Sequence, residues 1–125
     1  MTRGASASRS AAAAFAGLIV GVMVTTVAAV VLFMDRTHTV HTYPGPAHDI
    51  YAASVKEVRS PMNSGHHEVW LGRLDGGDVG RGHVVPIPLG WGVEPRIDWE
   101  PDVVVLHFEP GGEIRVPMTM VVDHR

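Results

Sequence analysis

Cysteine is absent from all 125 residues of the sequence. Without it the chain has no disulfide bonds, no thiolate metal ligands and no cysteine nucleophile. Acidic side chains are absent from the first 34 residues, whose only charged side chains are Arg3 and Arg9. Residues 35–125 therefore contain the other eight of the ten Lys and Arg residues and all thirteen Asp and Glu residues, which gives this segment a net charge of −5. Because an acidic domain repels phosphate backbones, we expect no nucleic-acid partner.

Charge is also absent from residues 11–34, which read AAAAFAGLIVGVMVTTVAAVVLFM. A helix of this length would extend about 36 Å, enough to cross a hydrocarbon core of about 30 Å with some tilt. It is apolar on every side, whereas a helix packed in a soluble domain keeps a polar face. We therefore predict a transmembrane helix over residues 11–34, preceded by a short cytoplasmic tail over residues 1–10.

Residues within and next to this helix indicate whether it is cleaved as a signal sequence and how it is oriented in the membrane. Residues 27–29, Val-Ala-Ala, resemble a cleavage site, but the apolar run continues well beyond them, which favours a retained signal-anchor over a cleaved signal. Arg3 and Arg9 precede the run, whereas Arg36 after it is adjacent to Asp35. This excess of positive charge predicts a single-pass protein of the cell membrane, with the N-terminus in the cytoplasm and the C-terminal domain outside.

Small residues recur at every fourth position of the predicted helix, namely Ala13, Gly17, Gly21 and Thr25. At this spacing they share one face, where a second helix can approach closely. Besides the lipid bilayer, we therefore consider a membrane-protein partner or a homo-oligomer that pairs through Gly17 and Gly21. The alternative is that these glycines carry no such role, since Gly and Ala are common in membrane helices.

The segment after the helix, residues 35–49, contains two prolines and a glycine and shows no hydrophobic periodicity. It is predicted to be a flexible linker. His38, His41, His48 and Asp49 form the densest set of metal-ligand side chains in the chain. A zinc site needs ligands held at fixed distances, which a flexible segment does not provide, so we expect no metal and no cofactor. Metal binding by these four residues remains the alternative.

Residues 50–125 consist of short β-favouring runs separated by turn residues, without a helical period. We expect strands over residues 51–59, 68–73, 83–88 and 93–99, with a short helix as the alternative for the first, and a loop over residues 60–65. The clearest element is a hairpin of residues 103–108 and 113–118, joined by a type II turn at Pro110 and Gly111.

These elements predict an α+β chain, one transmembrane helix followed by a small antiparallel β-meander domain of four to six strands. In the last strand, Ile114, Val116, Met118 and Met120 alternate with polar residues or proline, which indicates one buried face. The expected core consists of Val69, Leu71, Val84, Ile87, Ile97, Trp99, Val104, Leu106, Phe108, Ile114 and Val116.

The end of the chain resembles that of a group of other proteins. Residues 99–105, which read WEPDVVV, together with Phe108, the glycines at 111–112 and the Val-Pro pair at 116–117, are similar to the tail of small uncharacterised bacterial single-pass membrane proteins. The resemblance implies the same architecture, an N-terminal span and a short β-rich C-terminal domain. It implies no activity.

Three groups of residues contain side chains of the types found in calcium sites or hydrolase active sites. The carboxylates at 98, 100 and 102 are two residues apart, but Pro101 interrupts them and a calcium site needs a closed loop of oxygens. Residues 75–78, Asp-Gly-Gly-Asp, lack the pattern of a calcium loop and fit a hairpin turn. Ser64 with His66 and His67 lies outside any nucleophile-elbow context. We therefore expect no enzymatic activity.

Trp91 lies between Gly90 and Gly92 in a predicted loop. Its indole is either exposed and available for a partner or the lipid interface, or it caps the open end of the sheet. From these features we expect a non-enzymatic accessory or interaction module of the cell envelope. The alternative function is an extracytoplasmic protein that binds a ligand or metal ion through the histidine segment.

Overall fold

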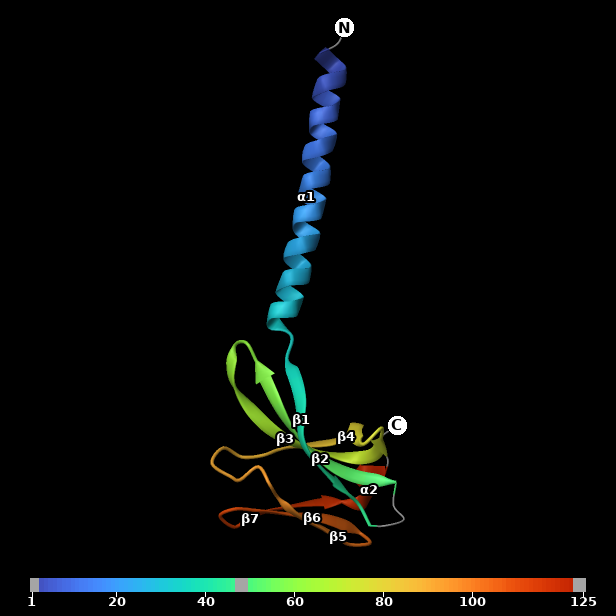
Figure 1. The fold of residues 1–125 in the computed structure, drawn as a ribbon, viewed down its shortest axis with the longest axis vertical. Coiled ribbons are helices and arrows are strands. Elements are labelled where there is room, and N and C mark those ends of the chain that lie inside the picture. The colour runs from blue at the N-terminus through green and yellow to red at the C-terminus, as the bar shows by residue number, and fades with distance from the viewer. Residues whose placement is uncertain (1–2, 47–49, 123–125) are drawn as a thin grey trace. The chain divides into compact units, whose positions relative to one another are not determined.

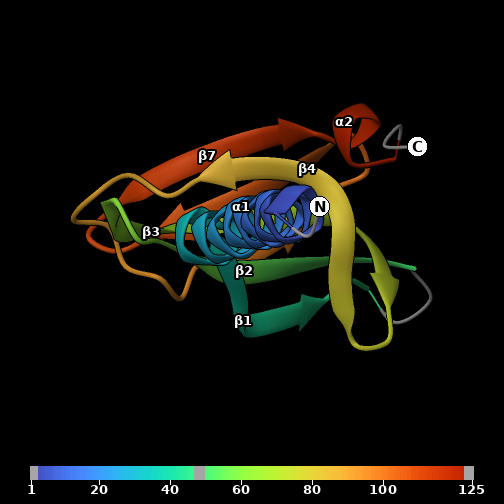
Figure 2. The same ribbon diagram turned by 90° about the horizontal axis from the view of Figure 1, so that it is seen from above.

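The computed structural model describes residues 3–46 and 50–122 (Figures 1 and 2). The chain forms two compact units, Met1–Met34 and Asp35–Arg125. The first holds the helix α1, Arg3–Phe33, and the second holds seven strands and a short helix. In order these are β1 Arg36–Pro44, β2 Tyr51–Ser60, β3 Asn63–Asp75, β4 Asp78–Pro86, β5 Arg96–Trp99, β6 Val103–Phe108, β7 Gly112–Pro117 and α2 Met118–Val122.

Helix α1 is long and apolar enough to cross a membrane over Gly4–Phe33, and none of its apolar side chains is buried within the chain. It begins earlier than the predicted span, so residues 3–10 of the expected tail are helical. The hydroxyl groups of Thr25 and Thr26 donate hydrogen bonds of 2.8 Å to the backbone carbonyls of Gly21 and Val22. Each of these two hydroxyl groups thus has an acceptor within the helix, as an apolar solvent requires.

The second unit contains two antiparallel sheets, ordered β1-β2-β3-β4 and β5-β6-β7. Each strand pairs with its neighbour in sequence, so each sheet is a meander. The predicted α+β class, an apolar N-terminal helix followed by antiparallel β-structure, is confirmed. Within the described residues there are seven strands in two sheets, where a single meander of four to six strands was expected.

The flexible linker predicted over residues 35–49 is wrong for residues 36–44. This segment is β1 and pairs with β2 from Arg36 opposite Arg59 to Pro44 opposite Ala52. Its sequence, RTHTVHTYP, lacks hydrophobic alternation because its faces are made of Thr, His and Tyr, but β-branched and aromatic residues still favour an extended strand. Gly45 and Pro46 follow the strand, and residues 47–49 lie outside the described part of the chain.

The two sheets share one hydrophobic core. Ala53, Val55, Val69 and Leu71 of the first sheet cluster with Val104, Leu106, Phe108 and Val116 of the second, and Ile87 and Val121 join them. Most of the expected core residues are buried or packed against this cluster, but Val84 is 38% exposed. Val84 lies opposite Trp70 on the other face of the sheet. Ala53 and Val55 were missed because β2 was not expected to be a central strand.

Three expected turns and ends differ in the structure. The loop predicted over residues 60–65 is only a turn at Pro61 and Met62, because β3 begins at Asn63. The N–H of Gly111 donates to the carbonyl of Phe108 at 2.7 Å, so the turn spans residues 108–111 and Pro110 is its third residue, not the second as in a type II turn. Beyond Pro117 the chain turns into α2, where Met120 is 49% exposed and Val121 is buried.

A pair of glycines bends the β3–β4 hairpin. Gly72 lies opposite Gly82, and a Cβ on either would overlap backbone atoms of the other strand. The register shifts between Gly72 and Leu74, and β4 is a strongly curved ribbon in Figure 2. A bulge combined with close backbone approach increases local bending. The hairpin thereby places Asp78, at the start of β4, next to side chains of β1 and β2.

Candidate functional site

The histidines of the predicted linker lie on an ordered strand. In β1, His38 is opposite Glu57 and His41 is opposite Val55, with a bulge between Thr39 and His41 that places both histidines on one face. His41 Nε2 lies 3.2 Å from Glu94 Oε1. The expected ligands His48 and Asp49 lie outside the described residues. Within residues 3–46 and 50–122, no group of three or more His, Asp or Glu side chains is arranged to hold a metal ion.

The small-residue face of α1, which the sequence analysis considered for helix pairing, is uncovered by the described part of the chain. A shallow groove runs along it, lined by Gly17, Leu18, Gly21, Val22, Thr25 and Thr26. No atom of the described residues lies within 4 Å of a Cβ built on Gly17 or Gly21, beyond their neighbours in the helix. The backbone of α1 is thus accessible at these two positions, as close helix packing in a membrane requires.

Trp91 is partly buried and packs against the β-domain. Its ring centroid lies 5.3 Å from that of Phe108, and it packs against the hydrophobic core. A Cβ at residue 112 would overlap the indole ring, so Gly112 leaves the space that Trp91 fills. Of the two readings of this residue, the structure supports packing against the end of the β6–β7 hairpin.

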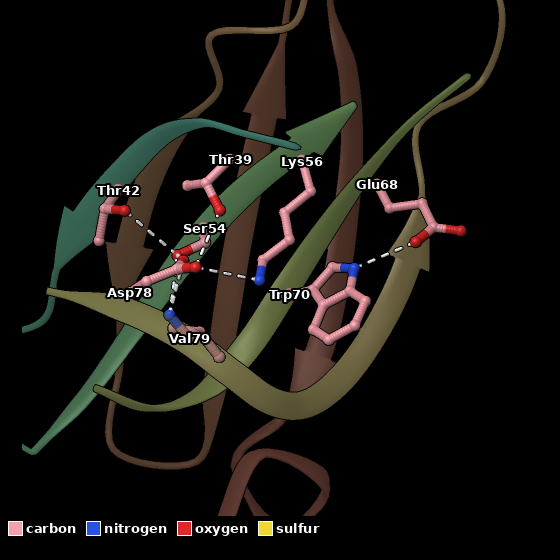
Figure 3. A network of polar contacts seen from close by, with 8 residues as sticks. All are labelled: Thr39, Thr42, Ser54, Lys56, Glu68, Trp70, Asp78 and Val79. Carbon is pink, nitrogen blue, oxygen red and sulfur yellow. Dashed lines mark hydrogen bonds and ion pairs between the residues drawn. The ribbon is translucent and has the colours of Figure 1, made fainter. Parts of the chain in front are cut away.

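The most connected polar group in the domain was missed by the sequence reading. The Asp78 carboxylate accepts hydrogen bonds from Thr39 Oγ1 at 2.9 Å, Ser54 Oγ at 2.8 Å and the Val79 N–H at 2.7 Å, as Figure 3 shows. Lys56 Nζ lies 3.2 Å from the same carboxylate. Burial by itself would raise the pKa of Asp78, but the hydrogen bonds from Ser54, Thr39, Val79 and Lys56 lower it below its ordinary value.

Lys56 joins this group to an aromatic side chain. Only 7% of its side chain is exposed, and Nζ lies 4.3 Å from the centroid of the Trp70 ring (Figure 3). The Trp70 indole N–H donates to Glu68 at 3.0 Å, and the other oxygen of Glu68 lies 2.9 Å from His66 Nε2. The carboxylate and the aromatic ring both attract the ammonium group of Lys56. A Lys held in this way is a structural cation.

The geometry does not favour hydrolytic chemistry at this group. Ser54 is fully buried and its hydroxyl donates to Asp78, whose lowered pKa makes the carboxylate a weak general base. The Ser64, His66 and His67 group lies on the first part of β3, where His66 contacts Glu68. Residues 75 and 78 form the ends of the β3–β4 turn, as expected for a hairpin connection.

A charged row covers the outer face of the β5–β7 sheet. His107 Nε2 lies 2.9 Å from Asp98 and Nδ1 lies 3.7 Å from Glu113. Arg96 lies 3.5 Å from Asp98 and Arg115 lies 2.6 Å from Glu113. The hydrogen bond from Arg115 lowers the pKa of Glu113. Asp98 is thus engaged with His107, and it does not converge with Glu100 and Asp102 on a cation site.

This row borders an open pocket of about 420 Å³. The pocket could not be predicted from the sequence because its lining residues come from two separate segments. The lining consists of Glu94, Arg96, His107, Phe108, Glu109, Pro110 and Gly111. Its lining holds two carboxylates, Glu94 and Glu109, and one guanidinium, Arg96, a formal net charge of −1 with histidine neutral. The pocket therefore offers little excess charge of one sign to recognise an ionic ligand.

Comparisons with protein-family models, with curated proteins and with solved structures gave no match.

Proposed function

We propose that this chain is a membrane-anchored, non-enzymatic interaction module, whose α1 helix spans the cell membrane and whose β-domain lies on the outer side. One observation carries the proposal. Helix α1 leaves its entire apolar surface uncovered by the rest of the described chain. Burying one such side chain contributes about 1.5–3 kcal/mol, so a helix with this many exposed apolar side chains is stable only in lipid or against another protein.

The direction of insertion follows from charge. Arg3 and Arg9 precede the apolar segment without any acidic neighbour, whereas Arg36 follows Asp35. The excess of arginine favours retention of the N-terminal end in the cytoplasm. This orientation places the β-domain in the extracytoplasmic space, as in the small bacterial membrane proteins that the end of the chain resembles.

The mode of action that we propose is contact through the face of α1 that carries Gly17 and Gly21, either with another membrane protein or with a second copy. The groove along this face supports the proposal, because close backbone approach strengthens packing between helices in lipid. In the β-domain the buried Ser54 hydroxyl donates to Asp78, a carboxylate of lowered pKa and hence a weak base, and this supports a non-enzymatic role.

A crosslinking pull-down of the tagged full chain from native membranes tests the proposal. Gly17→Leu/Gly21→Leu fills the groove and is expected to abolish recovery of the crosslinked partner or dimer. Ala12→Leu/Ala16→Leu is the matched control, because it adds bulk at the same spacing on a different face of α1. Equal recovery with both variants would overturn contact through Gly17 and Gly21, and recovery of no crosslinked product would overturn the interaction role.

A further inference from the structure

The β2–β3 turn lies at the end of the β-domain where its first strand, β1, begins. Helix α1 ends at Phe33 and β1 begins at Arg36. Three residues of extended chain span at most about 11 Å. Arg36 lies directly opposite Arg59 near the end of β2, and adjacent strands are about 4.8 Å apart. Chain length alone therefore keeps Arg59, and the turn that follows it, close to the point where α1 ends.

The turn also extends beyond β1. Strand β2 runs antiparallel to β1, so the end of β2 lies beside the start of β1. After Arg59 the chain continues through Ser60, Pro61 and Met62 before β3 begins. Met62 is 76% exposed, although methionine is an apolar side chain. An apolar side chain at a projecting turn is suited to the boundary between headgroups and acyl chains.

Two arginines, Arg36 and Arg59, lie next to this turn, and each has an acidic neighbour, Asp35 in sequence and Glu57 through hydrogen bonds. No Asp or Glu occurs between Glu57 and Glu68, while residues 35–125 as a whole carry a net charge of −5. Arg36 and Arg59 are directly opposite each other across two strands, an arrangement that like charges disfavour. Glu57 accepts two hydrogen bonds from Arg59, at 3.0 and 3.2 Å, and so compensates one of the two arginines.

We propose that the β2–β3 turn is a second membrane contact, in which Met62 enters the lipid interface and Arg36 and Arg59 bind the phosphates of anionic lipid headgroups. The occupant is the bilayer that α1 spans, so this inference rests on the proposed function. An anionic phosphate between the two arginines relieves their repulsion, because each guanidinium can donate charge-assisted hydrogen bonds to it. The contact would hold the β-domain in a defined orientation on the membrane.

The absence of cysteine allows the contact to be measured with single labels on the full chain. Met62→Cys is labelled with the environment-sensitive fluorophore NBD and reconstituted in phosphatidylcholine–phosphatidylglycerol vesicles that contain a headgroup-level nitroxide lipid. Ile50→Cys is the matched control, because Ile50 is an exposed apolar residue at the other end of β2, about 33 Å away. We expect loss of most of the emission at residue 62 and no loss at residue 50.

Two further variants separate the possible outcomes. Leu18→Cys reports on α1: if a label there is not quenched by a nitroxide placed deep in the acyl chains, the span fails and the proposed function with it. If Leu18 is quenched but residue 62 is no more quenched than residue 50, only the membrane contact of the turn is overturned. Arg36→Gln/Arg59→Gln is expected to reduce quenching at residue 62, and unchanged quenching would overturn the role of the arginines.

Discussion

Gly72 and Gly82 face each other across β3 and β4 so closely that neither position accommodates a side chain. This close approach bends the hairpin and places Asp78 beside Thr39, Ser54 and Lys56. We expect Gly82→Ala to lower the free energy of unfolding of the β-domain by about 1–3 kcal/mol, the usual cost of forcing extra volume into a packed site. Urea unfolding of the full chain in detergent, followed by far-UV circular dichroism, measures this change.

Gly80→Ala is the control for that substitution. Gly80 lies on the same strand, and a Cβ there would meet no atom within 4 Å. The control should match the wild type, or exceed it slightly, because alanine restricts the unfolded chain. An equal loss of stability in both variants would show that the Gly72–Gly82 approach has no special role.

Asp78→Asn removes the charge that compensates buried Lys56. The amide can keep some of the hydrogen bonds from Thr39 and Ser54, but the ammonium group loses its carboxylate partner. An unsatisfied buried group costs about 1–3 kcal/mol, and we expect a loss of stability in this range by urea unfolding. Asp75→Asn, at the other end of the same turn, should change stability far less because Asp75 is exposed.

The same carboxylate makes stability depend on pH. Because the pKa of Asp78 is lower in the folded state than in the unfolded chain, its contribution is fully present above the unfolded value of about 3.9. The contribution is lost as the pH falls through the lowered folded value. Urea midpoints measured from pH 7 down into the acid range should therefore fall less steeply for Asp78→Asn than for the wild type. Parallel curves would contradict the assignment.

Trp91→Ala tests whether this residue packs or docks. Trp91 contacts Phe108 and fills the space over Gly112. Truncation should destabilise the domain by about 2–4 kcal/mol, slightly less than the cost of about 3–5 kcal/mol for a fully buried Trp, because Trp91 is only partly buried. Leu89→Ala, two residues earlier in the same loop, should change stability by less than about 0.5 kcal/mol because Leu89 is 89% exposed. A Trp91→Ala variant of unchanged stability would return the indole to the list of docking candidates.

Orientation in the membrane is tested by the accessibility of single cysteines in intact cells. A membrane-impermeant maleimide should label Asp75→Cys in the β-domain and should leave Ser8→Cys unlabelled until the cells are opened. The reverse pattern would place the domain in the cytoplasm. Labelling of both positions before lysis would argue against a span between them.

Local signals in the sequence predicted much of this architecture. Residues 11–34 predict a helix by length and lack of charge alone, and α1 contains them all except Met34. The 103–118 hairpin was predicted by the alternation in residues 113–117 and by a Pro-Gly turn, and strands β6 and β7 pair as expected, from Val103 opposite Pro117 to Phe108 opposite Gly112. These elements depend on interactions between residues that are near in sequence, so a local pattern is sufficient to indicate them.

Strand β1 and the Asp78 group could not be predicted in this way. The segment RTHTVHTYP has little apolar character, and it is a strand because β2 pairs with it along its whole length. Asp78 lies 22 residues after Lys56 in sequence, and the two meet because the β3–β4 hairpin, bent at Gly72 and Gly82, places the start of β4 beside β2. The packing of Trp91 could not be predicted because Gly112 lies 21 residues later in the sequence. Gly112 contributes only the space that its missing side chain leaves for the indole ring.

The sequence by itself determined that the chain has one apolar helix followed by a small antiparallel β-domain, because hydrophobic length and local turn chemistry act over a few residues. Only the tertiary structure decided which polar residues meet. It paired Lys56 with Asp78, placed Trp91 on Gly112 and set Arg36 opposite Arg59, because strand register and sheet bending are cooperative properties of segments far apart in the chain.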